Sequence, residues 1–77
     1  MKLNEAIAYK VNKLLEDKKV NQYYLYKNGG IPRSTISDVV NCKKKRVSAD
    51  TVYQICSTLN VSLSDFYNDP IFEDLED

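Results

Sequence analysis

Residues 20–41, VNQYYLYKNGGIPRSTISDVVN, contain two short helical patterns that flank a two-glycine turn. The second pattern has two faces. Ile36, Val39 and Val40 recur at i, i+3 and i+4, which is the spacing of a buried helical stripe. The other face offers one arginine and several short hydrogen-bonding side chains, namely Arg33, Ser34, Ser37, Asp38 and Asn41. A helix that packs on one side and presents such groups on the other suits contact with base edges in the major groove of DNA.

Helical periodicity also predicts the elements on the N-terminal side. We expect a first helix over residues 3–19, and its buried stripe consists of Leu3, Ile7, Val11, Leu14 and Leu15. A second helix starts at Asn21 or Gln22 and buries Leu25. It ends at the two glycines, because glycine readily takes the left-handed conformation that a helix C-terminus favours.

The third and fourth helices are separated by a basic loop. The third helix opens at Pro32, which suits the first helical position, and ends near Asn41. Residues 42–47 form the loop. Ser48 is a suitable N-cap for the fourth helix, and Asp50 in the first turn favours the helix dipole. The core face of this helix consists of Val52, Ile55, Cys56 and Leu59.

A short fifth helix completes the domain. Asn60 is suited to end the fourth helix in the left-handed conformation, and residues 62–65, SLSD, resemble a capping box. Leu63 and Phe66 are expected to pack inward. Because no segment has the pattern of a strand, the sequence predicts an all-α domain of five helices over residues 1–69, followed by an acidic tail over residues 70–77.

The charge of the chain is zero overall but unevenly distributed. All 11 Lys and Arg residues lie in residues 1–46 with only four acids, so this segment has a net charge of +7. Residues 47–77 contain seven acids and neither Lys nor Arg. Such asymmetry indicates contact with nucleic acid or a membrane, or an acidic tail. We favour nucleic acid because the densest basic run, residues 43–46, directly follows the proposed recognition helix.

The composition argues against an enzyme. The chain has no His, and we find no Gly-rich phosphate loop, nucleophile elbow or metal-ligand cluster. Cys42 and Cys56 form no metal or redox pattern, and Cys56 lies on an apolar helical face as a small hydrophobe. We therefore expect no catalytic site, no cofactor and no metal. The sequence also lacks a signal peptide and an apolar run long enough for a membrane span, which predicts a cytoplasmic protein without membrane contact.

Residues 3–67 resemble the lambda-repressor/Cro-type (XRE-type) helix-turn-helix family. The specific part is IPRSTISDVVN followed by a basic run, together with the spacing from Gln22 and Leu25 through Gly30 to Ile36 and Val39. The downstream SADTVYQICSTLNVSLSDFY is similar to the family's fourth helix, turn and fifth helix. The resemblance implies a five-helix lambda-repressor-like bundle from a prokaryotic cell, a phage or a mobile element.

The resemblance also implies roles for individual residues. Base edges would be contacted by Arg33, Ser34, Ser37 and Asp38. The DNA backbone would be contacted by Gln22, Asn41, Lys43, Lys44, Lys45 and Arg46. Three positions depart from the family. Tyr26 stands where Ala is usual, Gly29 where a larger residue is common, and Cys42 where Gly usually follows Asn41. We expect a swap of volume in which Tyr26 tilts over the space at Gly29.

The chemistry of these side chains leaves some alternatives open. Arg33 suits O6 and N7 of guanine, or a phosphate. Asp38 suits cytosine N4, and is otherwise a solvated surface acid. Residues 43–46 suit a row of phosphates, and are otherwise a solubilising loop. Tyr23, Tyr24 and Tyr26 lie on the supporting helix, so we expect at least one to pack inward rather than to stack on bases.

These observations predict a sequence-specific regulator of transcription, a repressor, that reads a pseudo-palindromic operator in double-stranded DNA as a homodimer. The predicted dimerisation residues are Phe66, Tyr67, Ile71, Phe72 and Leu75. The alternative is that they close the core of the single chain. Three other functions stay open: the antitoxin of a toxin–antitoxin pair, with the acidic C-terminal half bound to a basic protein; a protein-interaction module without DNA binding; and an RNA binder, disfavoured by the lack of stacking aromatics near the basic loop.

Overall fold

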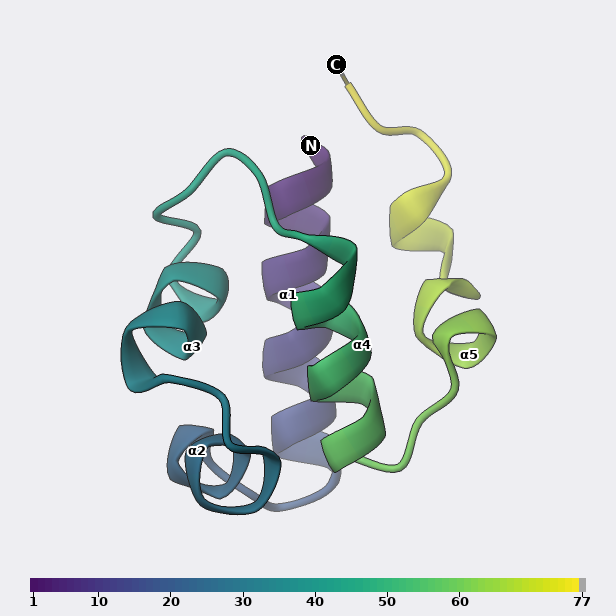
Figure 1. Ribbon diagram of the computed structural model, residues 1–77. Coiled ribbons are helices and arrows are strands. Elements are labelled where there is room, and N and C mark those ends of the chain that lie inside the picture. Colours follow the sequence, from purple (N-terminus) through teal and green to yellow (C-terminus); the bar gives the residue numbers. More distant parts are fainter. Residues whose placement is uncertain (77) are drawn as a thin grey trace.

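The computed structural model describes residues 1–76, over which all regular elements are helical. Five α-helices are followed by one 3-10 turn: α1 (Leu3–Asp17), α2 (Gln22–Gly29), α3 (Arg33–Val40), α4 (Ala49–Thr58), α5 (Leu63–Tyr67) and η1 (Pro70–Phe72). Figure 1 shows α1 in the middle of the bundle, with α2 and α3 on one side and α5 and η1 on the other. The predicted all-α, five-helix bundle is confirmed. Asp77, the last residue of the predicted tail, lies outside the described residues.

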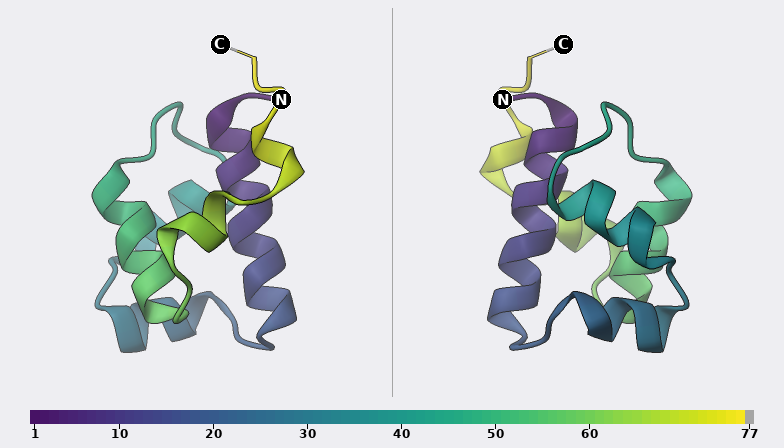
Figure 2. Two further views of the ribbon diagram at one scale, coloured as in Figure 1. Left: turned by 90° about the vertical axis from the view of Figure 1, so that its right-hand side faces the viewer. Right: turned by 90° about the vertical axis from the view of Figure 1, so that its left-hand side faces the viewer.

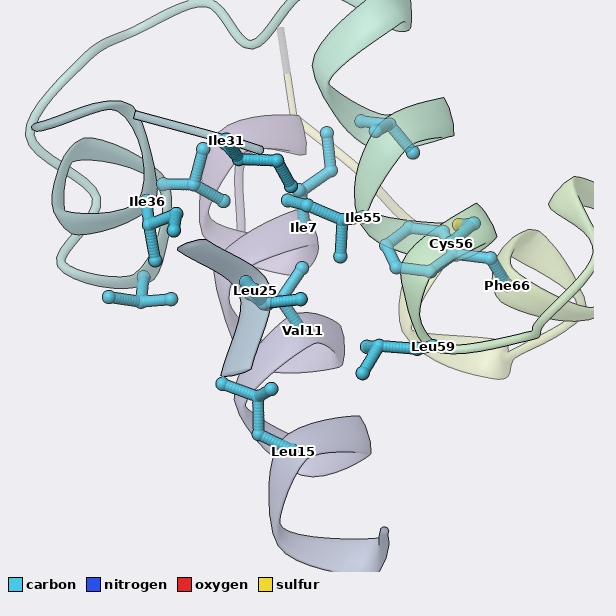
Figure 3. Packing of buried hydrophobic residues seen from close by; sticks show 13 residues of the cluster. Ile7, Val11, Leu15, Leu25, Ile31, Ile36, Ile55, Cys56, Leu59 and Phe66 are labelled. Carbon is cyan, nitrogen blue, oxygen red and sulfur yellow. The ribbon is translucent and has the colours of Figure 1, made fainter. Parts of the chain in front are cut away.

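Apolar side chains from α1 to α5 meet in one core (Figure 3). Its members are Ile7, Val11, Leu15, Leu25, Ile31, Ile36, Val39, Val40, Val52, Ile55, Cys56, Leu59 and Phe66. Complete burial of a large apolar side chain stabilises a protein by about 1.5–3 kcal/mol, and a chain this small needs most of these contributions. Cys56 is 1% exposed, as predicted, and burial raises the pKa of its thiol to about 11.

The predicted burial of two leucines is wrong. Leu3 is 50% exposed and Leu63 is 41% exposed. Each is the first residue of its helix, and helical side chains lean toward the N-terminus. Both leucines therefore extend past the start of the helix rather than into the core. In α1 the inward surface includes the small residues Ala6 and Ala8 instead.

Most of the predicted helix ends are present. Asn21, Ser48 and Ser62 each accept a hydrogen bond from the backbone N–H three residues later, at the N-caps of α2, α4 and α5. Such a cap stabilises a helix by about 1 kcal/mol. Gly30 ends α2 with φ of +65°, and Asn60 follows α4 with φ of +58°, as predicted. α1 ends at Asp17 rather than two residues later. Pro32 is the N-cap residue of α3, one position before the predicted one.

The expected packing of Tyr26 over Gly29 is wrong. A Cβ at Gly29 would overlap the hydroxyl of Thr58 on α4, so α4 already fills that space. Thr58 is held there because its hydroxyl donates a hydrogen bond to the Gln54 carbonyl at 2.7 Å. The Tyr26 ring turns outward and is 42% exposed. The close approach of α2 to α4 thus depends on glycine at residue 29.

The tail returns along α1 and closes the bundle. The Lys10 ammonium lies 3.0 Å from the Asp69 carboxylate, and both side chains are largely buried. Asp69 also accepts a hydrogen bond from the Ile71 N–H. This backbone hydrogen bond and the Lys10 ammonium lower the pKa of Asp69 below its usual value. Further along, the Glu76 N–H donates to the Met1 carbonyl at 3.0 Å, which places the described ends of the chain side by side (Figure 1).

Candidate nucleic-acid interface

The third helix has the two faces that its sequence predicts. Ile36, Val39 and Val40 are buried against the rest of the bundle. Arg33 and Ser34 are exposed at the start of the helix, and the other predicted base-contacting residues are half-buried further along it. Figure 2 (right) shows α3 on the outside of the bundle, with α2 below it and the 41–48 loop above. The polar face of α3 therefore lies on an open surface.

Two asparagines of α1 hold the end of α3 and the loop after it. The Asn12 amide donates to the Val40 carbonyl at 3.1 Å, which satisfies one of the last carbonyls of α3. The Asn4 amide donates to the Lys44 carbonyl at 2.9 Å. Sequence analysis misses both residues. Asn4, Ala8 and Asn12 are short side chains spaced four apart, so they form a row on one line of the helix. This row could have indicated that another segment packs closely there.

The basic loop is tied directly to the polar face of α3. The Ser37 hydroxyl accepts hydrogen bonds from the Asn41 amide and from the Lys43 ammonium, both at 3.2 Å. Residues 43–46 are exposed. The structure thus places one predicted base-contacting residue and two predicted backbone-contacting residues in one hydrogen-bonded group.

Cys42 turns the chain at the start of this loop in the left-handed conformation, with φ of +56°. A side chain other than Gly, Asn or Asp pays about 1–2 kcal/mol to adopt it. The half-buried sulfur receives the Asn4 amide at 3.2 Å. Cysteine therefore takes the conformation for which glycine is suited, and the loop starts from a strained residue.

Arg33 lies against two aromatic rings of α2. Its guanidinium carbon is 4.6 Å from the centroid of Tyr26 and 5.5 Å from that of Tyr23. Both distances are within the range of a cation–π interaction. The expectation that at least one of the three α2 tyrosines packs inward is wrong: Tyr23, Tyr24 and Tyr26 are 50%, 36% and 42% exposed. Leu25 alone fills the inward face of α2.

Two shallow hollows flank α3. One, of about 350 Å³, is lined by Gln22, Tyr23, Arg33, Ile36 and Ser37. It brings the predicted phosphate contact at the start of α2 next to the predicted base contacts. The other, of about 230 Å³, includes Asp38 together with the cationic Lys44 and Arg46. Ser34 lines neither hollow and is exposed at the N-terminus of α3.

The cations of this surface have no carboxylate partners within residues 1–76. The ion pairs in that part of the chain are those of Lys10 with Asp69 and of the Met1 amino group with Glu76, at 3.0 and 3.7 Å. Among residues 1–76, Arg33 and residues 43–46 therefore take part in no ion pair. The described residues contain no group of three His, Cys, Asp or Glu side chains that could hold a metal ion. None of their helices is both long and apolar enough to cross a membrane.

The family model of the Cro/C1-type HTH DNA-binding domain matches residues 10–70. The chain belongs to the Cro/C1-type helix-turn-helix family. The match runs from within α1 to the start of η1, so it includes the turn, α3 and the basic loop. Comparisons with curated proteins and with solved structures give no match.

Membership in the Cro/C1-type family makes this a DNA-binding regulator and DNA its partner. The contacts of its individual side chains with DNA stay predictions. The predicted dimerisation residues divide into two groups. Phe66 is fully buried in the core of the single chain, where it touches the rings of Tyr67 and Phe72. Tyr67 is 41% exposed, and Ile71, Phe72 and Leu75 are half-buried.

Proposed function

We propose that this protein is a sequence-specific repressor that binds a pseudo-palindromic operator in double-stranded DNA, with α3 in the major groove. The observation that supports this most is the open polar face of α3, continuous through Ser37 with a loop of four exposed cations. Arg33, Ser34, Ser37 and Asp38 would contact base edges. Gln22, Asn41 and residues 43–46 would bind phosphates on either side. Repression would require no binding surface besides the DNA-binding one, because a protein bound at a promoter excludes other proteins from that DNA.

The proposed binding unit is a homodimer. Half-sites one helical turn apart lie about 34–36 Å from centre to centre. The backbone of the bundle extends over 33 × 23 × 20 Å, so two copies can lie side by side on one face of the duplex at that spacing with a shorter dimension along the DNA. The exposed edges of Tyr67, Ile71, Phe72 and Leu75 offer apolar surface for the contact between copies. Phe66 would support that surface from within the core.

In vitro selection from random duplex DNA, followed by sequencing of the retained pool, tests this function. We expect an enriched palindrome whose half-sites are about one turn apart. Sedimentation of the complex on that duplex should then show two chains per site. One chain per site would contradict the homodimer and leave the operator contact intact.

A second candidate function is that of an antitoxin, which the seven acids of residues 47–77 favour because they suit a basic protein partner. An antitoxin also binds DNA, so selection does not separate the two. A neighbouring reading frame for a toxin, and coprecipitation of its product through the acidic half, would identify it. If selection retains no sequence and binding is weak and salt-labile, the repressor is excluded and a protein-interaction module becomes the better account.

A further inference from the structure

The Arg33 guanidinium lies against the rings of Tyr26 and Tyr23 at the start of α3. We propose that Tyr26 and Tyr23 are positioning residues that orient the Arg33 guanidinium for bidentate contact with one guanine of the operator. This inference rests on the proposed function, since it names the base that the start of α3 would recognise. It also gives a role to Tyr26 and Tyr23, which are neither buried in the core nor expected to stack on bases.

The two rings lie on the same side of the guanidinium. Their centroids are 6.0 Å apart, and the guanidinium carbon is 4.6 and 5.5 Å from them. A cation sandwiched between the rings would hold their centroids apart by nearly the sum of those two distances. Instead, the rings meet at 44° and form a shallow cradle that covers one side of Arg33. The other side of the guanidinium faces away from α2.

This arrangement keeps the hydrogen-bonding capacity of Arg33 free. A cation–π contact engages the faces of the aromatic rings and supplies no hydrogen-bond acceptor, so the N–H donors of the guanidinium are not used by it. In the part of the chain that the structure describes, no carboxylate forms an ion pair with Arg33. O6 and N7 of guanine provide the two acceptors that match such a fork in the major groove.

Orientation favours a base over a phosphate as the target. A phosphate can be approached from many directions, so a mobile side chain contacts it well. Guanine O6 and N7 lie in one plane at a fixed spacing, so an arginine must arrive in that plane. A free arginine loses rotamer freedom when it is fixed, and a preorganised one loses less on binding. The cradle of Tyr26 and Tyr23 supplies this preorganisation in the unbound protein.

The first experiment uses the free protein. We would record the NMR resonances of the Arg33 side-chain N–H and CH₂ groups in the full chain and in Tyr26→Leu and Tyr26→Phe variants. Leucine keeps apolar volume without a π-face, whereas phenylalanine keeps the ring and loses only the hydroxyl. Ring-current shifts at Arg33 should be present in the wild type and in Tyr26→Phe, and reduced in Tyr26→Leu. A matched control is Tyr53→Leu on α4, an exposed tyrosine that should leave Arg33 unchanged.

The second experiment measures affinity for the selected duplex and for duplexes changed at one base pair. Arg33→Ala identifies the guanine as the position at which discrimination is lost. Tyr26→Leu should then weaken binding to the intact duplex by about 2–5-fold, the factor expected for one exposed cation–π contact. Discrimination should fall at that guanine and at no other base pair. Tyr26→Phe should restore both quantities.

A double-mutant cycle separates positioning from direct contact. In the Arg33→Ala background, Tyr26→Leu should have no further effect on the affinity for the duplex. An equal loss in both backgrounds would mean that Tyr26 touches DNA itself and would overturn the proposal. Unchanged Arg33 resonances in Tyr26→Leu would overturn it as well. If selection yields no duplex, the proposed function and the guanine contact both fail, while the resonances still show whether the rings hold Arg33.

Discussion

The junction of α1 with η1 and the basic loop after α3 both contain cations, and the two regions differ in what those cations contact. Lys10 at the junction is largely buried, lies 3.0 Å from Asp69, and helps to hold the end of the chain against α1. Residues 43–46 in the loop are exposed and have no carboxylate partner among residues 1–76. A paired cation stabilises the fold and is unavailable to phosphate. An unpaired cation contributes little to the fold and retains the counterions that DNA binding can release.

This difference shows how a chain with no net charge can present a cationic surface. Seven of the eleven acids lie in residues 47–77, and the two ion pairs of the described residues involve acids of that segment. Neither of these ion pairs involves a cation of the loop. Net charge is therefore a poor guide to nucleic-acid binding in this protein, and the position of each charge relative to its neighbours is the informative quantity. Four predictions test the division between residues that stabilise the fold and the residues that we propose bind DNA.

The largest expected effect is on stability, at Phe66 of α5, whose ring lies against that of Phe72 in η1. Phe66→Ala should reduce the free energy of unfolding by about 3–5 kcal/mol, because it removes a fully buried ring. Urea denaturation followed by circular dichroism measures this. Leu63→Ala is the matched control in the same helix, and its cost should be much smaller because Leu63 is 41% exposed. Equal costs for the two variants would contradict the placement of Phe66 in the core.

The next effect concerns the residues that we propose bind DNA. Lys44→Ala combined with Lys45→Ala should lower the salt dependence of DNA binding by about two units, since each lost phosphate contact lowers the slope by about 0.9. Stability should change by less than about 0.5 kcal/mol, because both side chains are exposed. Lys13→Ala, which removes an exposed cation from α1, is the control and should leave the slope unchanged. An unchanged slope in the double variant would remove the loop from the interface.

A smaller effect is expected where the loop begins. Cys42→Gly should have a free energy of unfolding about 1 kcal/mol higher than that of Cys42→Ala, because both lose the contact of the sulfur with Asn4 but only glycine adopts the left-handed conformation without steric cost. Cys42→Ala keeps that cost and loses the contact of the sulfur with Asn4, so it should give no gain. A gain of similar size in both variants would locate the effect in the sulfur rather than in the backbone.

The smallest effect concerns Asp69. Its pKa is lowered in the folded state by the Ile71 N–H and the Lys10 ammonium. The charged carboxylate therefore contributes its full stabilisation above the pKa of Asp69 in the unfolded chain, which is about 3.9. This contribution is lost as the pH falls through the lower pKa of the folded state. Asp69→Asn should be less stable than the wild type at pH 7, with a difference that shrinks in acid. Asp74→Asn, an exposed control, should show little difference at either pH. A pH-independent difference would contradict the assigned role.

Local patterns predicted the parts of the structure that depend on local chemistry. The buried stripe of α3, the caps at Ser48 and Ser62 and the left-handed Gly30 each follow from residues within a few positions of one another. The Cro/C1-type family was recognisable for the same reason, because its most specific feature is a short stretch of fixed spacing. The side chains on the open face of α3 were also predictable, since burial of one helical face leaves the other exposed.

Contacts between distant segments were not predictable from such patterns. Lys10 and Asp69 pair across most of the chain, and the Asn4 amide reaches the Lys44 carbonyl from another helix. The placement of Arg33 over the Tyr23 and Tyr26 rings depends on the angle between α2 and α3, which no periodicity specifies. Burial at helix ends was misjudged at Leu3 and Leu63 because a helical stripe describes the direction of a side chain and not the extent of the core.

The contact between Gly29 and Thr58 limits the order in which substitutions at these positions can accumulate. A side chain at residue 29 meets the Thr58 hydroxyl, which is itself bonded to the Gln54 carbonyl and cannot easily move away. A lineage that first exchanges Thr58 for a smaller residue opens room into which residue 29 can later grow. The reverse order passes through an overpacked intermediate that selection would remove. Residues 29 and 58 are therefore expected to covary among descendants of this chain, because together they set the spacing between α2 and α4.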